Sequence, residues 1–176
     1  MAASNLTLRF ASAAVAIPLL LLLLFAGPAW GWLLFLLLAS FVGAYELFGM
    51  THPGDRAAMI GGGALTWAML VGLWFGIDEP RIVMTVVLLV PFAGIVLTLW
   101  RLGDMPTAAL RVAVSAFGPM WIGGGLGAIA LLRVVGKDDG PAFVVLSLAI
   151  AWMADTGGYF AGRFLGKHKL YEKVSP

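Results

Sequence analysis

The sequence has no cysteine, two histidines and few charged residues. Without cysteine there can be no disulfide, thiolate metal site or cysteine nucleophile, and His52 and His168 are too few for a multi-histidine zinc site. Charged residues make up 11% of the 176 positions, whereas a soluble domain carries about 25%. So few charges cannot cover a surface in water, so we expect a bilayer as solvent. The net charge of +2 is too small to indicate nucleic acid as a partner.

Long apolar stretches fill most of the chain. A helix needs about 20 mostly apolar residues to cross the hydrocarbon core. The sequence predicts six such spans, at residues 10–26, 29–50, 57–76, 82–100, 108–132 and 141–161. The connections are short, so we expect residues 1–176 to form a single all-α, polytopic membrane helix bundle. The first stretch also resembles a signal peptide, but Pro28 directly after Phe25-Ala26-Gly27 disfavours cleavage and favours a retained span.

The positions of lysine and arginine predict the orientation. In a six-span arrangement, one side carries eight basic residues, namely Arg9, Arg56, Arg101, Arg111, Arg163, Lys167, Lys169 and Lys173. The other side carries three, which are Arg81, Arg133 and Lys137. The excess places both termini of this chain in the cytoplasm.

Prolines and glycine clusters interrupt the spans. Pro18, Pro91 and Pro119 each remove a helical hydrogen bond and are expected to bend their helices. The clusters 61–63 and 123–125, three glycines each, allow helices to approach closely. We interpret all of these as packing features without chemistry.

Three charged residues lie within predicted spans, where each costs at least about 2.5 kcal/mol at mid-bilayer. They are Glu46, Arg111 and Asp155. The topology places all three at similar depth in the cytoplasmic half, which favours one shared polar cavity open to the cytoplasm. An alternative for Glu46 and Arg111 is that their long side chains reach the headgroups. The shorter side chain of Asp155 makes that alternative weaker there.

The sixth span and the tail carry the densest pattern. Residues four apart share a helix face, so Ala154, Gly158, Gly162 and Gly166 form a smooth stripe. The adjacent stripe consists of Asp155, Tyr159, Arg163 and Lys167. A carboxylate can hold Mg²⁺, and cations can meet phosphate oxygens. For the basic tail, residues 163–176, composition alone favours a positive anchor at anionic lipid.

Three short segments near the end of the chain resemble a known family. They are Ala154-Asp155-Thr156-Gly157-Gly158-Tyr159-Phe160-Ala161-Gly162 and Gly166-Lys167-His168-Lys169-Leu170, with Lys173-Val174-Ser175-Pro176 after them. They resemble the middle of bacterial phosphatidate cytidylyltransferases, also called CDP-diacylglycerol synthases. Ile17-Pro18 in the first span and Tyr45-Glu46-Leu47 at the end of the second are similar too. Spans three to five match in hydrophobicity more than in motif.

The resemblance implies a reaction in which phosphatidic acid attacks the α-phosphorus of CTP, giving CDP-diacylglycerol and pyrophosphate with a divalent metal, taken as Mg²⁺. It implies a bacterial inner membrane location and leaves the oligomeric state open, including a homodimer. Carried over by position, the catalytic residues are Asp155, Lys167 and Ser175, with Asp155 as a metal ligand. The substrate-binding residues are Tyr159, Arg163, Lys169, Glu46 and Arg111, of which Glu46 and Arg111 line or brace the cavity.

In the family, further spans and a carboxy-terminal signature with most metal-binding carboxylates follow the Ser-Pro pair. We therefore expect the catalytic carboxy-terminal portion to be missing from residues 1–176, and these residues alone to be inactive. The alternatives are a transporter or channel component, because charged residues can line a conduction path, and a non-catalytic membrane subunit. CTP-dependent lipid kinases are a closer alternative, but the segment from Asp155 to Pro176 matches them less well than it matches the cytidylyltransferases.

Overall fold

The computed structural model describes residues 2–166, and every regular element in that range is a helix. The elements are α1 (Ala2–Phe25), α2 (Ala29–Thr51), α3 (Arg56–Phe75), α4 (Pro80–Trp100), α5 (Met105–Pro119), the π-helix η1 (Met120–Gly124), α6 (Gly125–Val135), the 3₁₀ turn η2 (Lys137–Asp139) and α7 (Gly140–Leu165). This confirms the predicted all-α class.

Five helical stretches in the described chain are long and apolar enough to cross a membrane. They are Ala29–Thr51, Arg56–Phe75, Pro80–Trp100, Met105–Val135 and Lys137–Phe164, and Phe10–Phe25 is a shorter apolar helix. Their outer faces are apolar, as lipid requires: on α4, Leu88, Leu89 and Phe92 are 63%, 58% and 62% exposed. In water, a continuous surface of this kind would promote aggregation.

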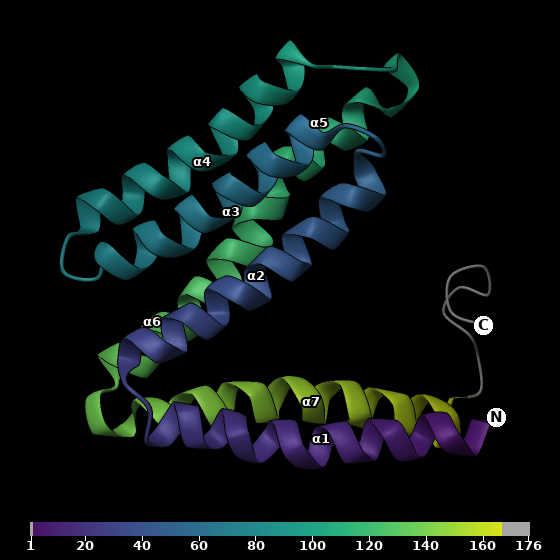
Figure 1. Ribbon diagram of the computed structural model, residues 1–176, viewed down its shortest axis with the longest axis vertical. Coiled ribbons are helices and arrows are strands. Elements are labelled where there is room, and N and C mark those ends of the chain that lie inside the picture. The colour runs from purple at the N-terminus through teal and green to yellow at the C-terminus, as the bar shows by residue number, and fades with distance from the viewer. Residues whose placement is uncertain (1, 167–176) are drawn as a thin grey trace.

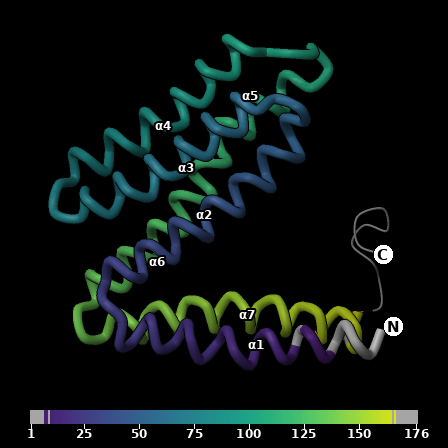
Figure 2. Tube along the Cα trace, in the orientation of Figure 1, coloured from purple at the N-terminus to yellow at the C-terminus, as the bar shows by residue number. Residues whose placement is uncertain are grey.

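Helices α2 to α6 form one slanted bundle, and α1 and α7 extend from one end of it (Figures 1 and 2). At that end a core cluster ties the elements together, consisting of Leu24, Trp32, Leu36, Leu70, Ala130 and Val144. Arg133 Nε also donates a hydrogen bond of 2.8 Å to the Leu24 carbonyl. From Ile150 to Phe164, every side chain of α7 is exposed, so this half of α7 stands apart from the bundle.

The prolines and glycines act as packing features, but unequally. Pro119 directly precedes η1, where the hydrogen-bond pattern widens, as it does at helix irregularities. A Cβ on Gly62 would collide with the Phe48 ring, so close approach of α3 to α2 needs that glycine. A Cβ on Gly63 would meet nothing within 4 Å, so only part of the first cluster serves tight packing.

Candidate functional site

A polar cluster lies where the α2–α3 and α4–α5 connections meet, at the end of the bundle opposite to α1 and α7 (Figure 1). We call it the Asp55 cluster, and it consists of His52, Asp55, Arg101, Arg111 and Ser115. Three of these residues, His52, Arg111 and Ser115, are buried with exposed fractions of 1%, 9% and 5%. Buried polar side chains are costly unless they are paired, so each contact within the cluster matters for the fold.

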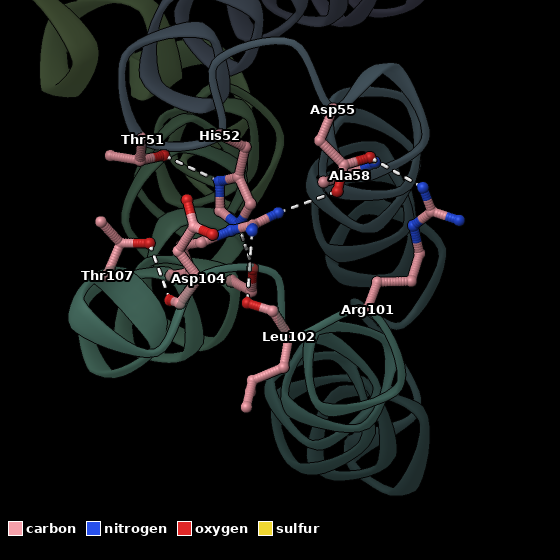
Figure 3. Close-up of polar contacts among 10 residues, drawn as sticks. Thr51, His52, Asp55, Ala58, Arg101, Leu102, Asp104 and Thr107 are labelled. Carbon is pink, nitrogen blue, oxygen red and sulfur yellow. Dashed lines mark hydrogen bonds and ion pairs between the residues drawn. The ribbon is translucent and has the colours of Figure 1, made fainter.

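Asp55 is the common acceptor of the cluster. One carboxylate oxygen, Oδ1, accepts hydrogen bonds from the Ala58 backbone N–H at 3.1 Å and from Arg101 Nη2 at 3.2 Å. The other, Oδ2, accepts one from Arg111 Nη2 at 2.8 Å. Figure 3 shows Asp55 facing Arg101 across the gap between two elements. Asp55 thus caps the amino terminus of α3 and joins that helix to α4 and α5.

The α4–α5 connection wraps around the guanidinium of Arg111. Its Nη1 donates to the Leu102 carbonyl at 3.2 Å. Gly103 has a φ of +66°, and a Cβ there would collide with Arg111 Nη1. Both the backbone conformation and the space taken by the guanidinium therefore require glycine at this position. In the described chain, Arg111 Nε is buried without a hydrogen-bond partner. The guanidinium is therefore held on one edge and keeps a free donor on the other.

His52 links the cluster to the end of α2. The Thr51 hydroxyl lies 2.8 Å from the Leu47 carbonyl and 3.0 Å from His52 Nδ1. Because the Thr51 proton is donated to that carbonyl, Thr51 Oγ1 must accept from Nδ1–H. This assigns the proton of neutral His52 to Nδ1 and leaves Nε2 as an acceptor for the Ser115 hydroxyl, 3.4 Å away. The hydroxyl and the ring form a buried network between α2 and α5.

Two cavities adjoin the cluster. A small one of about 160 Å³ is lined by all five cluster residues, together with Gly61, Gly62, Gly94 and Thr98 from the neighbouring helices. A larger one of about 600 Å³ opens beside it and is lined mainly by polar residues, among them Arg56, Arg101, Asp104, Thr107 and Arg111. Three arginines and two aspartates around the larger cavity favour an anionic ligand group.

The cluster shifts the titration of its two ionisable connection residues. The hydrogen bond from the Ala58 N–H lowers the pKa of Asp55, and the Arg101 and Arg111 guanidinium groups lower it further. Burial lowers the pKa of His52, and the charge of Arg111 acts in the same direction. Asp55 is thus held charged and His52 neutral near pH 7.

The structure places the site residues predicted from sequence in three settings. Arg111 belongs to the Asp55 cluster, whereas Glu46 on α2 and Asp155 on α7 are exposed. The two cavities beside the Asp55 cluster are lined by Arg111 but not by Glu46 or Asp155, so in the described chain Arg111 lies apart from the other two. Lys167, Lys169 and Ser175 lie outside the described residues.

The described members of the predicted polar stripe, Asp155, Tyr159 and Arg163, lie on α7. Arg163 Nη1 donates a hydrogen bond of 2.8 Å to the Tyr159 hydroxyl, as the spacing of four residues predicts. The smooth stripe beside it has no packing partner in the described part of the chain, since a Cβ on Gly158 or Gly162 would meet nothing within 4 Å. Asp155 and its neighbours therefore face outward from the bundle.

Sequence reasoning missed Asp55 and the inward position of His52. A signal for His52 exists, because the buried residues of α2 recur every fourth position, at Trp32, Leu36, Ser40, Ala44 and Phe48, and the next step is His52. The same stripe turns Glu46 away from the bundle. Asp55 has a weaker signal, since it is an acid in a short connection on the side predicted to carry several arginines.

A divalent metal, expected as Mg²⁺, needs several oxygen ligands from carboxylates, carbonyls and water. Nowhere in residues 2–166 do three His, Cys, Asp or Glu side chains come together. A metal held by Asp155 would take its remaining ligands from water, from substrate phosphates or from residues outside 2–166.

Comparison with known proteins gives a family. Phosphatidate cytidylyltransferases of Staphylococcus haemolyticus (strain JCSC1435) and Staphylococcus epidermidis (strain ATCC 12228 / FDA PCI 1200) are each 40% identical to this chain over 40 residues. The phosphatidate cytidylyltransferase of Staphylococcus aureus (strain COL) is 38% identical to it over 40 residues. Each match covers 23% of this chain and only 15% of the relative. No solved structure gives a significant match. The model of the cytidylyltransferase family, however, matches residues 7–176, and the chain therefore belongs to that family.

Proposed function

We propose that this chain acts in the transfer of CMP from CTP to phosphatidic acid, as part of a phosphatidate cytidylyltransferase. The observation that carries the proposal is the family match over residues 7–176, and the names of the relatives supply the lipid substrate. In this reaction a phosphate oxygen of phosphatidic acid forms a bond to the α-phosphorus of CTP. The bond from that phosphorus to the bridging oxygen breaks, and pyrophosphate leaves with the electron pair.

Both substrates are polyanions, so the protein must mainly position them and offset their charge. We propose Asp155, Lys167 and Ser175 as catalytic residues, with Tyr159, Arg163 and Lys169 binding substrate phosphates. The 2.8 Å hydrogen bond from Arg163 to Tyr159 supports a preorganised cation on that face of α7. Mg²⁺ remains a proposed cofactor, with Asp155 as one ligand.

For Arg111 and Glu46 we propose different roles. Because Arg111 is buried and paired with Asp55, its contacts favour bracing the cytoplasmic end of the bundle over direct contact with the lipid. Glu46 is exposed on α2, so it can meet a substrate or the headgroup region. An assembly of two copies also remains proposed, and the exposed half of α7 would suit it.

We propose a bacterial inner membrane location with both termini of this chain cytoplasmic. The eight basic residues on one side against three on the other support it. Because the chain has no cysteine, single substitutions can test it without background. Pro53→Cys should react with an impermeant maleimide only after the inner membrane is opened. Asp138→Cys should react from the outside, and the reverse pattern would contradict the orientation.

Labelled CTP tests the activity and separates it from its nearest alternative. The product of the complete reading frame that contains residues 1–176 is expressed in bacteria depleted of their own synthase, and membranes receive phosphatidic acid. CTP labelled at the α-phosphate should transfer its label to lipid, and CTP labelled at the γ-phosphate should not. The opposite result would identify a kinase, and no transfer of either label would contradict the proposal. Residues 1–176 alone, run beside it, test the expected inactivity.

A further inference from the structure

An apolar groove runs along the outer surface between α2 and α3, and none of its lining residues belongs to the Asp55 cluster. We call it the α2–α3 groove. It has a volume of about 570 Å³ and is lined by Phe41, Tyr45, Arg56, Met59, Ile60, Gly63, Ala64 and Trp67. Its large side chains are open to the surroundings, with Phe41 at 55%, Ile60 at 73% and Trp67 at 44% exposure. The small Gly63 leaves it hollow, because a Cβ there would meet nothing within 4 Å.

Aromatic side chains line the end of the groove at Trp67, away from Arg56. Trp67 Nε1 donates a hydrogen bond of 3.1 Å to the Leu37 carbonyl, so the indole of α3 is fastened to α2. The rings of Phe41 and Trp67 lie 6.3 Å apart, and those of Phe41 and Tyr45 lie 6.5 Å apart. The wall is therefore aromatic, and its indole N–H already has an acceptor.

Arg56 stands at the opposite end, at the start of α3. It lines both the apolar groove and the polar cavity of about 600 Å³ beside the Asp55 cluster. Asp55 holds Arg101 and Arg111 in ion pairs, whereas the side chain of Arg56 makes no hydrogen bond or ion pair to another residue in the described chain. Its five donors are thus free for an external acceptor.

The length of the groove matches one leaflet. Arg56 and Trp67 are eleven residues apart on one helix, which at about 1.5 Å per residue places them roughly 16 Å apart along the axis. Half of a hydrocarbon core of about 30 Å is about 15 Å. A groove with a cation at one end and an apolar wall of this length is complementary to one phospholipid, with its phosphate at the cation and an acyl chain along the wall.

We propose that the α2–α3 groove binds a single anionic phospholipid from the surrounding leaflet, with Arg56 at its phosphate and an acyl chain lying over Gly63 and Ala64 against Trp67. The site is separate from the face of α7 that carries Asp155. The proposal does not depend on cytidylyl transfer, since it concerns lipid binding without CTP.

Quenching of Trp67 by brominated lipid tests the proposal. The chain is reconstituted into phosphatidylcholine nanodiscs that contain phosphatidylglycerol with brominated acyl chains, or brominated phosphatidylcholine at equal mole fraction. The difference between wild type and Trp67→Phe isolates the signal of Trp67. A cation near the surface is worth about 1 kcal/mol toward an anionic lipid, which is about a five-fold preference. We expect phosphatidylglycerol to occupy the groove about five-fold more readily than phosphatidylcholine.

Two pairs of variants separate the site from general effects. Arg56→Gln should abolish the preference, whereas Arg81→Gln, an exposed cation at the opposite end of the bundle, should keep it. Gly63→Leu should fill the groove and protect Trp67 from both lipids without disturbing the fold, because leucine also favours a helix more than glycine does. Gly125→Leu, where a Cβ likewise meets open space, should leave the quenching unchanged. Circular dichroism and size-exclusion chromatography are used as controls to check that each variant is folded.

Three results would overturn the proposal. Equal quenching by the two lipids in wild type would mean that only general boundary lipid contacts Trp67. A preference that persists in Arg56→Gln would mean that the cation does not bind the phosphate. No quenching by either lipid would mean that protein, such as a second copy of the chain, covers the groove.

Discussion

Arg111 Nη2 lies 2.8 Å from Asp55 Oδ2, although the two residues are 56 positions apart in the chain. This ion pair closes the end of the bundle, because Asp55 begins α3 and Arg111 lies in the second turn of α5. The side chains of Asp55 and Arg111 are 16% and 11% exposed, so water screens the pair only weakly. Without Asp55, Arg111 Nη2 would lose its carboxylate partner, so the pair contributes to the stability of this end of the molecule.

Asp55→Asn tests the pair. Asparagine is also a good N-cap, so the substitution removes the charge while keeping a cap on α3. Leaving a buried charged group without its partner costs about 2 kcal/mol. We expect the free energy of unfolding in detergent to fall by about that amount. Asp104→Asn, at an exposed acid whose side chain makes no hydrogen bond or ion pair in the described chain, should change it by less than about 0.5 kcal/mol. Equal losses in both variants would contradict the role of the pair.

Acid should weaken the fold through Asp55. Its pKa is lowered from 3.8 in the folded state, chiefly by the Ala58 N–H and then by the arginines. The unfolded chain then binds the proton more tightly, so this stabilisation is complete above about pH 4 and is lost as pH falls through the folded pKa. Thermal unfolding between pH 6 and pH 3 should show a falling midpoint in wild type and a flatter profile in Asp55→Asn. Parallel profiles would refute the assignment.

A second loss of stability should appear closer to neutrality, through His52. Burial and then the charge of Arg111 lower its pKa from 6.5. The neutral ring is favoured in the fold, so its contribution is complete above about pH 6.5 and declines as pH falls toward the folded pKa. His52→Gln should lower stability at all pH values but flatten the slope between pH 7.5 and pH 5. A slope unchanged from wild type would mean that His52 does not titrate with unfolding.

Two glycines with positive φ separate backbone strain from contact with Arg111. Gly54 has a φ of +79° with nothing near its missing Cβ, whereas Gly103 has a φ of +66° with Arg111 Nη1 in the way. Gly54→Ala should cost about 1 kcal/mol through strain alone. Gly103→Ala should cost about 1 to 2 kcal/mol more, because the guanidinium must move off Asp55. Urea unfolding of both variants measures the difference, and equal costs would show that Arg111 adapts freely.

The sequence predicted the helices well because apolar runs and lipid thickness determine them. Spans expected at 29–50, 57–76 and 82–100 correspond to Ala29–Thr51, Arg56–Phe75 and Pro80–Trp100. The span expected at 108–132 is interrupted after Pro119, where the π-helix η1 divides it. Composition fixes the existence of such a span but not its local hydrogen-bond pattern.

The site was predictable only in part, because partners come from different connections. The place of Arg111 within a span favoured a shared polar cavity, with reach to the headgroups as the alternative, and the structure shows Arg111 buried. Its partner could not be read from the same argument, since Asp55 lies outside the spans and reaches Arg111 only when the bundle closes. Glu46 was expected nearby on depth alone. The rotation of α2, with Ala44 and Phe48 buried, turns Glu46 outward.

Asp155→Asn tests the proposed catalytic face of α7 in the product of the complete reading frame. The Asp155 side chain is exposed and makes no hydrogen bond in the described chain, so the variant should accumulate and unfold like wild type. Transfer of α-labelled CMP to phosphatidic acid should fall about a hundred-fold, which equals about 2.7 kcal/mol of activation free energy. Asp138→Asn, an exposed acid in η2, makes the same change in charge and should retain full activity. If Asp155→Asn kept wild-type transfer, or if both variants lost it equally, the carboxylate of Asp155 would have no specific part in the reaction.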